Sequence, residues 1–184
     1  MMKRYTGRLL AVLLAAAAMT ALVGSATASA AVWKDAGATV TNAFEMGLTG
    51  TENYEVESSA GGVQCSERFV ISFDGASTTT VSKFENKGCG KTFGTYAACT
   101  VQSVEAIGLP WTVTLGTSTL TINNMHMRHT FKAGCAKGEI NQTLNMTLTP
   151  DSTSKISTLN FFGTSGTYKQ FGDFTVETPT YGIG

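Results

Sequence analysis

Beyond Ala30 the chain consists of short runs in which apolar residues alternate with Thr, Ser or charged residues, and long helical periodicity is missing. In residues 140–149, for example, Ile, Leu and Met occupy even positions while Thr143, Thr147 and Thr149 occupy odd ones. This period of two is typical of strands with one buried and one solvated face. About nine or ten such runs are separated by Gly, Asn and Asp turn signals, which predicts an all-β, single-domain antiparallel β-sandwich or barrel.

The N-terminal segment is of another kind. Three basic residues, Lys3, Arg4 and Arg8, precede an apolar stretch that runs from Leu9 to Val23, and the small triplet at 28–30 is typical of signal-peptidase cleavage. The apolar stretch, about 15 residues, is shorter than the roughly 20 that a spanning helix needs. We therefore predict a signal peptide over residues 1–30 and a secreted β domain over residues 31–184 without an integral membrane segment.

The net charge of the predicted secreted domain limits the classes of partner that it can bind. The whole chain carries 13 basic and 13 acidic side chains, and removal of residues 1–30 leaves 10 against 13, a net charge of −3. Binding to nucleic acid requires a basic footprint that such a domain lacks. We therefore expect no nucleic-acid partner.

Four cysteines, Cys65, Cys89, Cys99 and Cys135, lie in the predicted secreted domain. An even number in an exported chain indicates two disulfides. The alternative, a zinc site, is disfavoured because no C-x-x-C motif occurs. Each bridge would stabilise the domain by about 3 kcal/mol.

The pairing follows from a predicted hairpin. A turn at residues 74–76 joins a strand over 63–73 to one over 78–84, which places Cys65 opposite roughly residue 86 and thus near Cys89. Cys99 and Cys135 then form the second pair. A simple meander would separate these two, so we expect the chain to cross or bend, with a bulge at Asn123-Asn124, where the apolar parity switches.

Catalytic motifs are missing from the sequence. There is no G-x-S-x-G nucleophile motif, and the two histidines, His126 and His129, point to opposite faces of a strand because they lie three residues apart. The acidic residues Glu45, Glu52, Glu55 and Glu57 are spread over both strand faces, and we interpret them as surface charge. We predict no catalytic residue and no enzymatic activity.

The string Met125-His126-Met127-Arg128-His129 contains ligand types that suit copper. Met125 and Met127, however, share the parity of Phe131, as core residues do, which leaves His126 and Arg128 on the solvated face. We therefore expect no metal site and no cofactor, and titration with copper should show no tight stoichiometric binding.

Several aromatic residues break the inward parity or lie near predicted loops. We select Trp33, Tyr54, Tyr96 and Phe93 as candidate ligand contacts, and Phe162, Tyr168, Phe171 and Tyr181 share the same character. Exposed rings on a β scaffold suit the binding of carbohydrate or adhesion to a surface. The predicted partner is an extracellular ligand or a cell-surface polymer of unknown identity.

The segment from Cys65 to Cys135 carries a resemblance. Its Cys99-Thr-Val, followed by Gly108-Leu-Pro-Trp111 and alternating apolar residues, resembles small secreted actinobacterial proteins of unknown function. It also resembles exported proteins named as activators of alkane oxidation, which have a similar Leu-Pro-Trp before a strand. Both resemblances imply a secreted, β-rich, non-enzymatic protein.

Two functions fit these features. The first is a secreted, non-catalytic extracellular protein that acts as a surface-associated binding or adhesive module. The second is a carrier that holds an apolar small molecule in the interior of a β-barrel, since inward-facing Met and Phe residues suit either a filled core or an apolar cavity. The two differ in whether the interior is filled or hollow.

Overall fold

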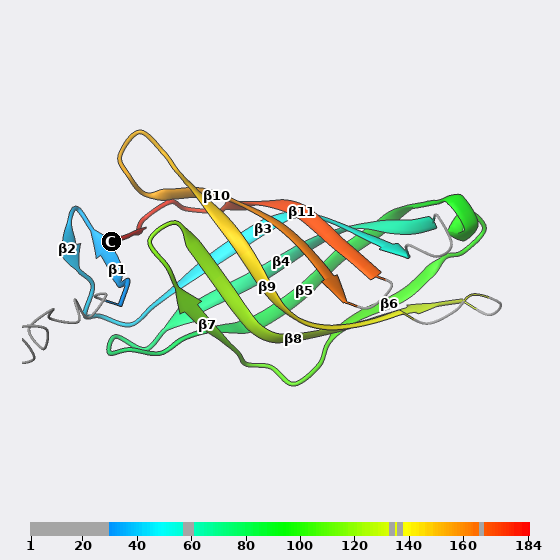
Figure 1. The fold of residues 1–184 in the computed structure, drawn as a ribbon, viewed down its shortest axis with the longest axis horizontal. Coiled ribbons are helices and arrows are strands. Elements are labelled where there is room, and N and C mark those ends of the chain that lie inside the picture. Colours follow the sequence, from blue (N-terminus) through cyan, green and yellow to red (C-terminus); the bar gives the residue numbers. More distant parts are fainter. Residues whose placement is uncertain (1–29, 57–60, 133–134, 136–137, 166–167) are drawn as a thin grey trace, which may run out of the picture.

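Long antiparallel strands form the body of the protein (Figure 1). The computed structural model describes residues 30–184 apart from 57–60, 133–134, 136–137 and 166–167. The predicted signal peptide therefore lies outside the described residues except for Ala30. The long strands are β3 (Phe44–Val56), β4 (Gly61–Phe73), β5 (Thr79–Phe93), β8 (Thr119–Phe131), β9 (Gly138–Pro150), β10 (Ile156–Ser165) and β11 (Tyr168–Val176). None of the described helical segments has the length and hydropathy needed to cross a membrane.

The sheet closes on itself. Its strands follow the order β8-β7-β5-β4-β3-β11-β10-β9, with β7 at Trp111–Leu115, and β9 pairs back onto β8, so that eight strands form a barrel. A short strand, β6 (Val101–Ala106), pairs with the far half of β8. At one end lies a small sheet of β1 (Trp33–Asp35), β2 (Ala38–Thr39) and β12 (Gly182–Ile183). The predicted all-β class is confirmed, and of the two predicted architectures the barrel is the one formed.

Both predicted disulfides, Cys65–Cys89 and Cys99–Cys135, are confirmed. Cys65 pairs directly with Cys89 across β4 and β5 because two register shifts, at Val70/Ile71 and Ser66/Glu67, lie between the turn and Cys65. Each shift advances the pairing on β5 by one residue, so the partner of Cys65 lies beyond the predicted residue 86. The turn also forms as predicted, and Asp74 Oδ1 accepts hydrogen bonds from the backbone N–H groups of Ala76, Ser77 and Thr78.

The second disulfide requires no crossing between sheets. Strands β6 and β7 are successive segments along the same edge of β8, since Val101 pairs with Phe131 and Val113 pairs with Ile122. One long strand therefore returns past both segments, which brings the chain after β8 beside Cys99. The expected bulge is also present: the β8–β9 register shifts between Ile122 and Met125.

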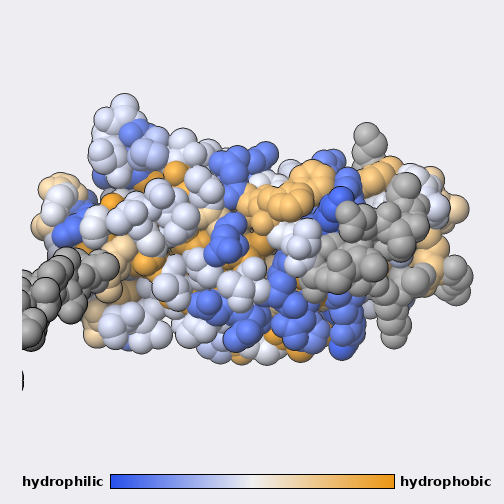
Figure 2. Space-filling model, viewed as in Figure 1, coloured by the Kyte–Doolittle hydropathy of each residue, from blue (hydrophilic) through white to orange (hydrophobic). Residues whose placement is uncertain are grey.

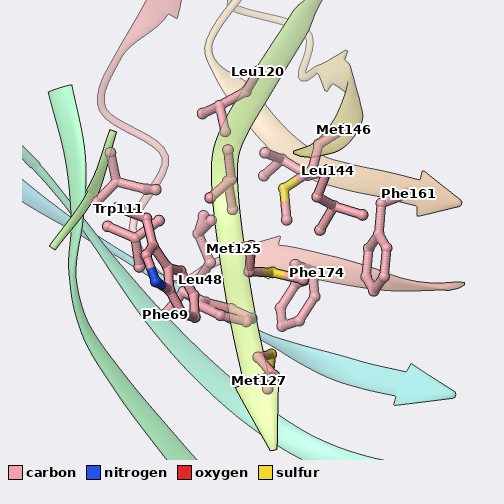
Figure 3. Packing of buried hydrophobic residues seen from close by; sticks show 14 of the residues in the cluster. Leu48, Phe69, Trp111, Leu120, Met125, Met127, Leu144, Met146, Phe161 and Phe174 are labelled. Atoms are coloured by element: carbon pink, nitrogen blue, oxygen red, sulfur yellow. The ribbon is translucent and has the colours of Figure 1, made fainter. Parts of the chain in front are cut away.

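Large side chains fill the barrel interior. In Figure 3, Met125 and Met127 point from β8 toward Phe69 and Phe174, and all four side chains are buried. Phe174 contacts Phe69 edge-on, with ring centroids 5.1 Å apart. Trp111 begins β7 on the buried face. The predicted inward orientation of both methionines is thus confirmed, and these side chains occupy the space that a carrier would leave for a ligand.

Candidate functional site

A groove of about 510 Å³ lies on the outer face of the barrel over β3, β4, β10 and β11. A row of residues in direct register crosses these strands: Phe162, Phe171, Asn53 and Gln64. Among the described residues, Phe162 alone of the large hydrophobic side chains is largely exposed, at 63%. The groove is thus built from residues up to 122 positions apart, Thr51 and Asp173, that only the strand register brings together.

A second, parallel row lines the same groove. It contains Asn160, Asp173 and Thr51, which also pair across β10, β11 and β3. The Asn160 amide donates a hydrogen bond to the Asp173 carboxylate. In the first row, Gln64 Nε2 donates to Asn53 Oδ1 at 3.1 Å. These contacts hold amide and carboxylate groups beside the aromatic rings.

The groove therefore has an aromatic half and a polar half. Figure 2 shows an apolar patch bordered by hydrophilic side chains over β10 and β11. An exposed ring offers a flat apolar surface, and amides supply both donors and acceptors. This combination suits a ligand with apolar faces and peripheral hydroxyl groups, such as a sugar ring.

A second candidate site is a polar cluster inside the barrel. Glu52, Glu67, His129 and Gln170 are each at most 1% exposed. Gln170 Nε2 donates to Glu52 Oε1, and Gln142 Nε2 donates to Gln170 Oε1 at 2.7 Å. Four different strands thus supply the buried carboxylates, imidazole and amide.

The electrostatics of this cluster are strongly perturbed. Burial raises the pKa of Glu67 well above its usual value, and the neighbouring Glu52 carboxyl raises it further. Burial also lowers the pKa of His129, against the influence of Glu52. The Tyr54 ring stacks on His129 with centroids 4.5 Å apart and an interplanar angle of 18°. Because Glu67 and His129 are buried, the cluster is not accessible to a substrate from solvent.

The interpretation of Glu52 as surface charge is wrong. Glu52 shares the inward face of β3 with Leu48 and Tyr54, and its strand partner is the buried Cys65. Gly50 interrupts the apolar alternation between these positions, so the sequence shows no inward pattern at Glu52. Glu57, in the same predicted group, lies outside the described residues.

The expected exposure of the selected aromatic residues is also wrong in three cases. Trp33, Tyr54 and Tyr96 are buried, and Phe93 is half-buried. Tyr96 packs against Phe131, with ring centroids 5.1 Å apart, because the short helix η2 (Gly94–Tyr96) folds over the barrel end. Ligand contact by these four residues stays a prediction.

The predicted orientation of the 125–129 string is confirmed. His126 and Arg128 lie on the outer face, where both contact Glu139 on β9: His126 Nε2 lies 3.4 Å from Oε2, and Arg128 Nε donates to Oε1 at 2.6 Å. His129 lies on the opposite, inner face. The two histidines thus do not share a site.

An apolar pocket of about 350 Å³ lies at the end of the barrel beside the three-stranded sheet. Trp33, Val40, Phe73, Val113 and Leu115 are among its lining residues. Trp33 Nε1 donates to Thr79 Oγ1 at 3.0 Å, which fixes the indole as one wall. The pocket is suited to a small apolar ligand.

The sequence analysis identified the rings of Phe162 and Phe171 as unusual but did not identify the polar groups beside them. Asn53, Gln64 and Asp173 have no local signal of a site, because each is an ordinary outward residue of its own strand. Only the predicted period of two could have placed each on an outer face. Their alignment in one groove depends on the order and register of four strands.

Comparison with known proteins identifies a family. The chain matches the model of the family described as alkane oxidation protein activator PraA/PraB-like over residues 5–177. This match extends the second resemblance well beyond Cys65 to Cys135, whereas the resemblance to actinobacterial proteins stays a prediction. Neither the comparison with curated proteins nor that with solved structures gives a match.

Proposed function

Because the chain belongs to the PraA/PraB-like family of alkane oxidation protein activators, we propose that it promotes alkane oxidation without catalysing it, as an exported protein that binds a surface polymer. The observation that carries this proposal is the groove in which Phe162 and Phe171 lie beside a polar row. An exposed aromatic patch rimmed by polar groups is characteristic of an interaction site. In this proposal the protein attaches the cell or its secreted enzymes to a surface.

The chemistry of the groove favours a polysaccharide as the polymer. The exposed ring of Phe162 suits stacking against the C–H face of a sugar, while Asn53, Gln64 and Asp173 suit hydrogen bonds to its hydroxyls. An open groove, unlike a closed pocket, accepts the middle of a long chain. These three amide and carboxylate groups, fixed in two neighbouring rows, would select among sugars by hydroxyl position.

A non-catalytic role is supported by the placement of the titratable groups. The perturbed carboxyl and imidazole groups of Glu67 and His129 lie in the interior, out of reach of a polymer in the groove. The groove itself contains Asp173 as its carboxylate, and this group is engaged by Asn160. Such a surface binds a ligand without an acid–base pair to act on it.

Export is supported by the cysteines. Two disulfides form and persist in oxidising compartments such as the periplasm or the extracellular space. A protein that acts on a surface polymer would also need to leave the cytoplasm. The predicted signal peptide over residues 1–30 provides the route in this proposal.

Co-sedimentation with insoluble cellulose and chitin tests the proposal. Protein produced from the full coding sequence should sediment with at least one of the two polysaccharides. The substitutions Phe162→Ala and Asn53→Ala should each weaken binding by about tenfold or more, because each removes one half of the site. Gln102→Ala, which removes an exposed amide on β6, a strand that contributes no residue to the groove, is the matched control and should bind as the wild type does. Lack of binding to both polymers, or binding that survives Phe162→Ala, would contradict the proposal.

A second candidate function is supported by the apolar end pocket. Its volume, about 350 Å³, falls in the range of small-molecule sites, and its walls suit an alkyl chain. The filled interior argues against a ligand inside the barrel and moves the carrier hypothesis to this pocket. Native mass spectrometry after incubation with a medium-chain alkane should then show a one-to-one complex that Trp33→Ala weakens, and a spectrum of free protein alone would oppose this function.

A further inference from the structure

The buried cluster contains more acceptor atoms than its hydrogen bonds satisfy. Within the described part of the chain, five of its ligand-type atoms have no hydrogen bond of good geometry: Glu52 Oε2, both ring nitrogens of His129, and both oxygens of Glu67, which has the Asn86 side chain and the Glu52 carboxyl group beside it. All three side chains are at most 1% exposed. A buried polar group without a partner costs roughly 1–3 kcal/mol, and a buried charge costs more. Five such atoms in one place require an explanation.

The atoms converge from three strands. Cys65 Sγ, a Glu67 oxygen and a His129 nitrogen all lie within 4.8 Å of one another. Cys65 is bonded to Cys89 and so supplies no thiolate, which removes it as a ligand. Glu52 takes its place, since its carboxyl group contacts that of Glu67 and acts electrostatically on His129.

We propose that Glu52, Glu67 and His129 together hold a divalent metal ion of the zinc type inside the barrel. Two carboxylates and one neutral imidazole form a borderline ligand set that suits zinc and its neighbours. Zinc lies about 2.0–2.2 Å from such ligands, so two ligands on one ion are at most about 4 Å apart. The Glu67 oxygen and the His129 nitrogen are therefore within about 1 Å of that spacing, and a rotation of the Glu52 side chain, whose carboxyl group contacts that of Glu67, would complete the ligand set.

Neighbouring groups already orient two of these three side chains. Gln170 donates a hydrogen bond to one oxygen of Glu52, which leaves the other oxygen available as a ligand. The Tyr54 ring, stacked on His129, fixes the plane of the imidazole. Such supporting contacts are what metal ligands in proteins typically have.

A shared proton is the rival explanation. Two adjacent buried carboxyl groups can satisfy each other when one is protonated, which agrees with the raised pKa of Glu67. A proton between Glu52 and Glu67 still leaves both nitrogens of His129 without a partner. A metal ion satisfies both carboxylates and one imidazole nitrogen at once.

The proposed role is structural. The three ligand side chains are buried, so an ion held by them would be out of reach of a substrate from solvent. Its ligands come from the neighbouring strands β3 and β4 and from β8, which lies across the barrel from them (Figure 1). The ion would thus join opposite walls and be acquired as the barrel folds. This inference is independent of the groove and of the function proposed for it.

Metal analysis of the full chain tests the site. Protein produced without chelators, or refolded with Zn²⁺, should retain about one equivalent after dialysis, and EDTA should lower its melting temperature. Glu67→Gln and His129→Gln should each weaken zinc affinity by about 100-fold or more. The matched control is the His126→Gln/Glu139→Gln pair, which removes the same two residue types from the outer face of β8 and β9, and should retain the metal.

Loading the wild-type protein with Co²⁺ tests the site even if the variants fail to fold. Wild-type protein loaded with Co²⁺ should show absorption bands of a site with oxygen and nitrogen ligands and no thiolate band. Wild-type protein that binds neither ion overturns the proposal, as does a thiolate band or metal retained in folded Glu67→Gln. A metal-free wild type whose stability Glu67→Gln leaves unchanged would identify the shared proton instead.

Discussion

The Arg68 guanidinium donates two hydrogen bonds to the Glu177 carboxylate, at 2.6 Å and 2.9 Å, although the residues lie 109 positions apart. Thr49 Oγ1 donates a third, at 2.7 Å. These contacts tie the segment after β11 to β4 across the intervening β3. The bonds from Arg68 and then Thr49 lower the pKa of Glu177 to about 2 from its ordinary 4.5.

This contact predicts an acid-dependent loss of stability. A carboxyl group with a lowered pKa in the folded state stabilises the fold fully above its ordinary pKa, and this contribution is lost as pH falls from about 4.5 to about 2. The substitution Glu177→Gln should lower the free energy of unfolding at pH 7 by less than about 1 kcal/mol, because the side chain is 37% exposed. Urea denaturation at pH 7 and near pH 2 should show the difference from wild type vanish at the lower pH.

Glu105→Gln provides the control for the lost charge, since Glu105 accepts a hydrogen bond from the nearby Ser103 on an exposed edge. Its effect on stability should be small at both pH values. An equal loss in Glu177→Gln at pH 7 and pH 2 would contradict the assignment of this stability to the ionised carboxylate.

Adjacent phenylalanines on β10 should respond in opposite ways to truncation. Phe161 is buried at 6% exposure and stacks on Phe174, whereas Phe162 is 63% exposed. Phe161→Ala should cost about 3–5 kcal/mol of stability because it leaves a cavity in the core. Phe162→Ala should change stability by less than about 0.5 kcal/mol yet impair polymer binding. Thermal denaturation of both variants tests whether Phe161 faces the core and Phe162 faces solvent. Similar losses of stability in the two variants would contradict this assignment.

The strands and both disulfides could be predicted because their signals are local. Each strand reads as an alternation over a few residues, and the Cys65–Cys89 pair follows from one hairpin. The inward position of Glu52 could not be predicted, because Glu is rarely buried and its neighbour Gly50 carries no apolar signal. Burial of Glu52 and Glu67 depends on closure of the barrel, which requires β11 to pair with β3, more than 100 residues away in the sequence.

The groove could be predicted only in part from the sequence. The alternation placed Phe162 and Phe171 as unusual rings, but the adjoining Asn53 and Gln64 become part of the site only when β11 pairs with β3. That pairing joins positions more than 100 residues apart. Sequence patterns assign a face to each residue, whereas a site on a barrel wall also requires the order of the strands.

Loss of the two disulfides should have unequal effects. Each closes a loop of similar length, 24 and 36 residues in sequence separation, so each should contribute about 3 kcal/mol through chain entropy. Cys65 is in addition buried at 1% exposure, whereas Cys99 and Cys135 are half-buried. The Cys65→Ala/Cys89→Ala variant should therefore unfold at lower denaturant concentration than the Cys99→Ala/Cys135→Ala variant. The reverse order would show that the loop around Cys135 carries more of the stability than burial implies.

The last prediction concerns the bulge in β8. Asn124 has a φ of +52°, in the left-handed region that Asn and Gly tolerate and β-branched residues do not. Asn124→Gly should leave the free energy of unfolding nearly unchanged, whereas Asn124→Val should lower it by about 1–2 kcal/mol. Asn145→Val, on regular strand β9, is the control and should cost little because Val favours extended backbone. If Asn124→Val lowered the free energy of unfolding no more than Asn145→Val does, the bulge would not determine the inward orientation of Met125 and Met127. The switch in apolar parity along β8 would then have another cause.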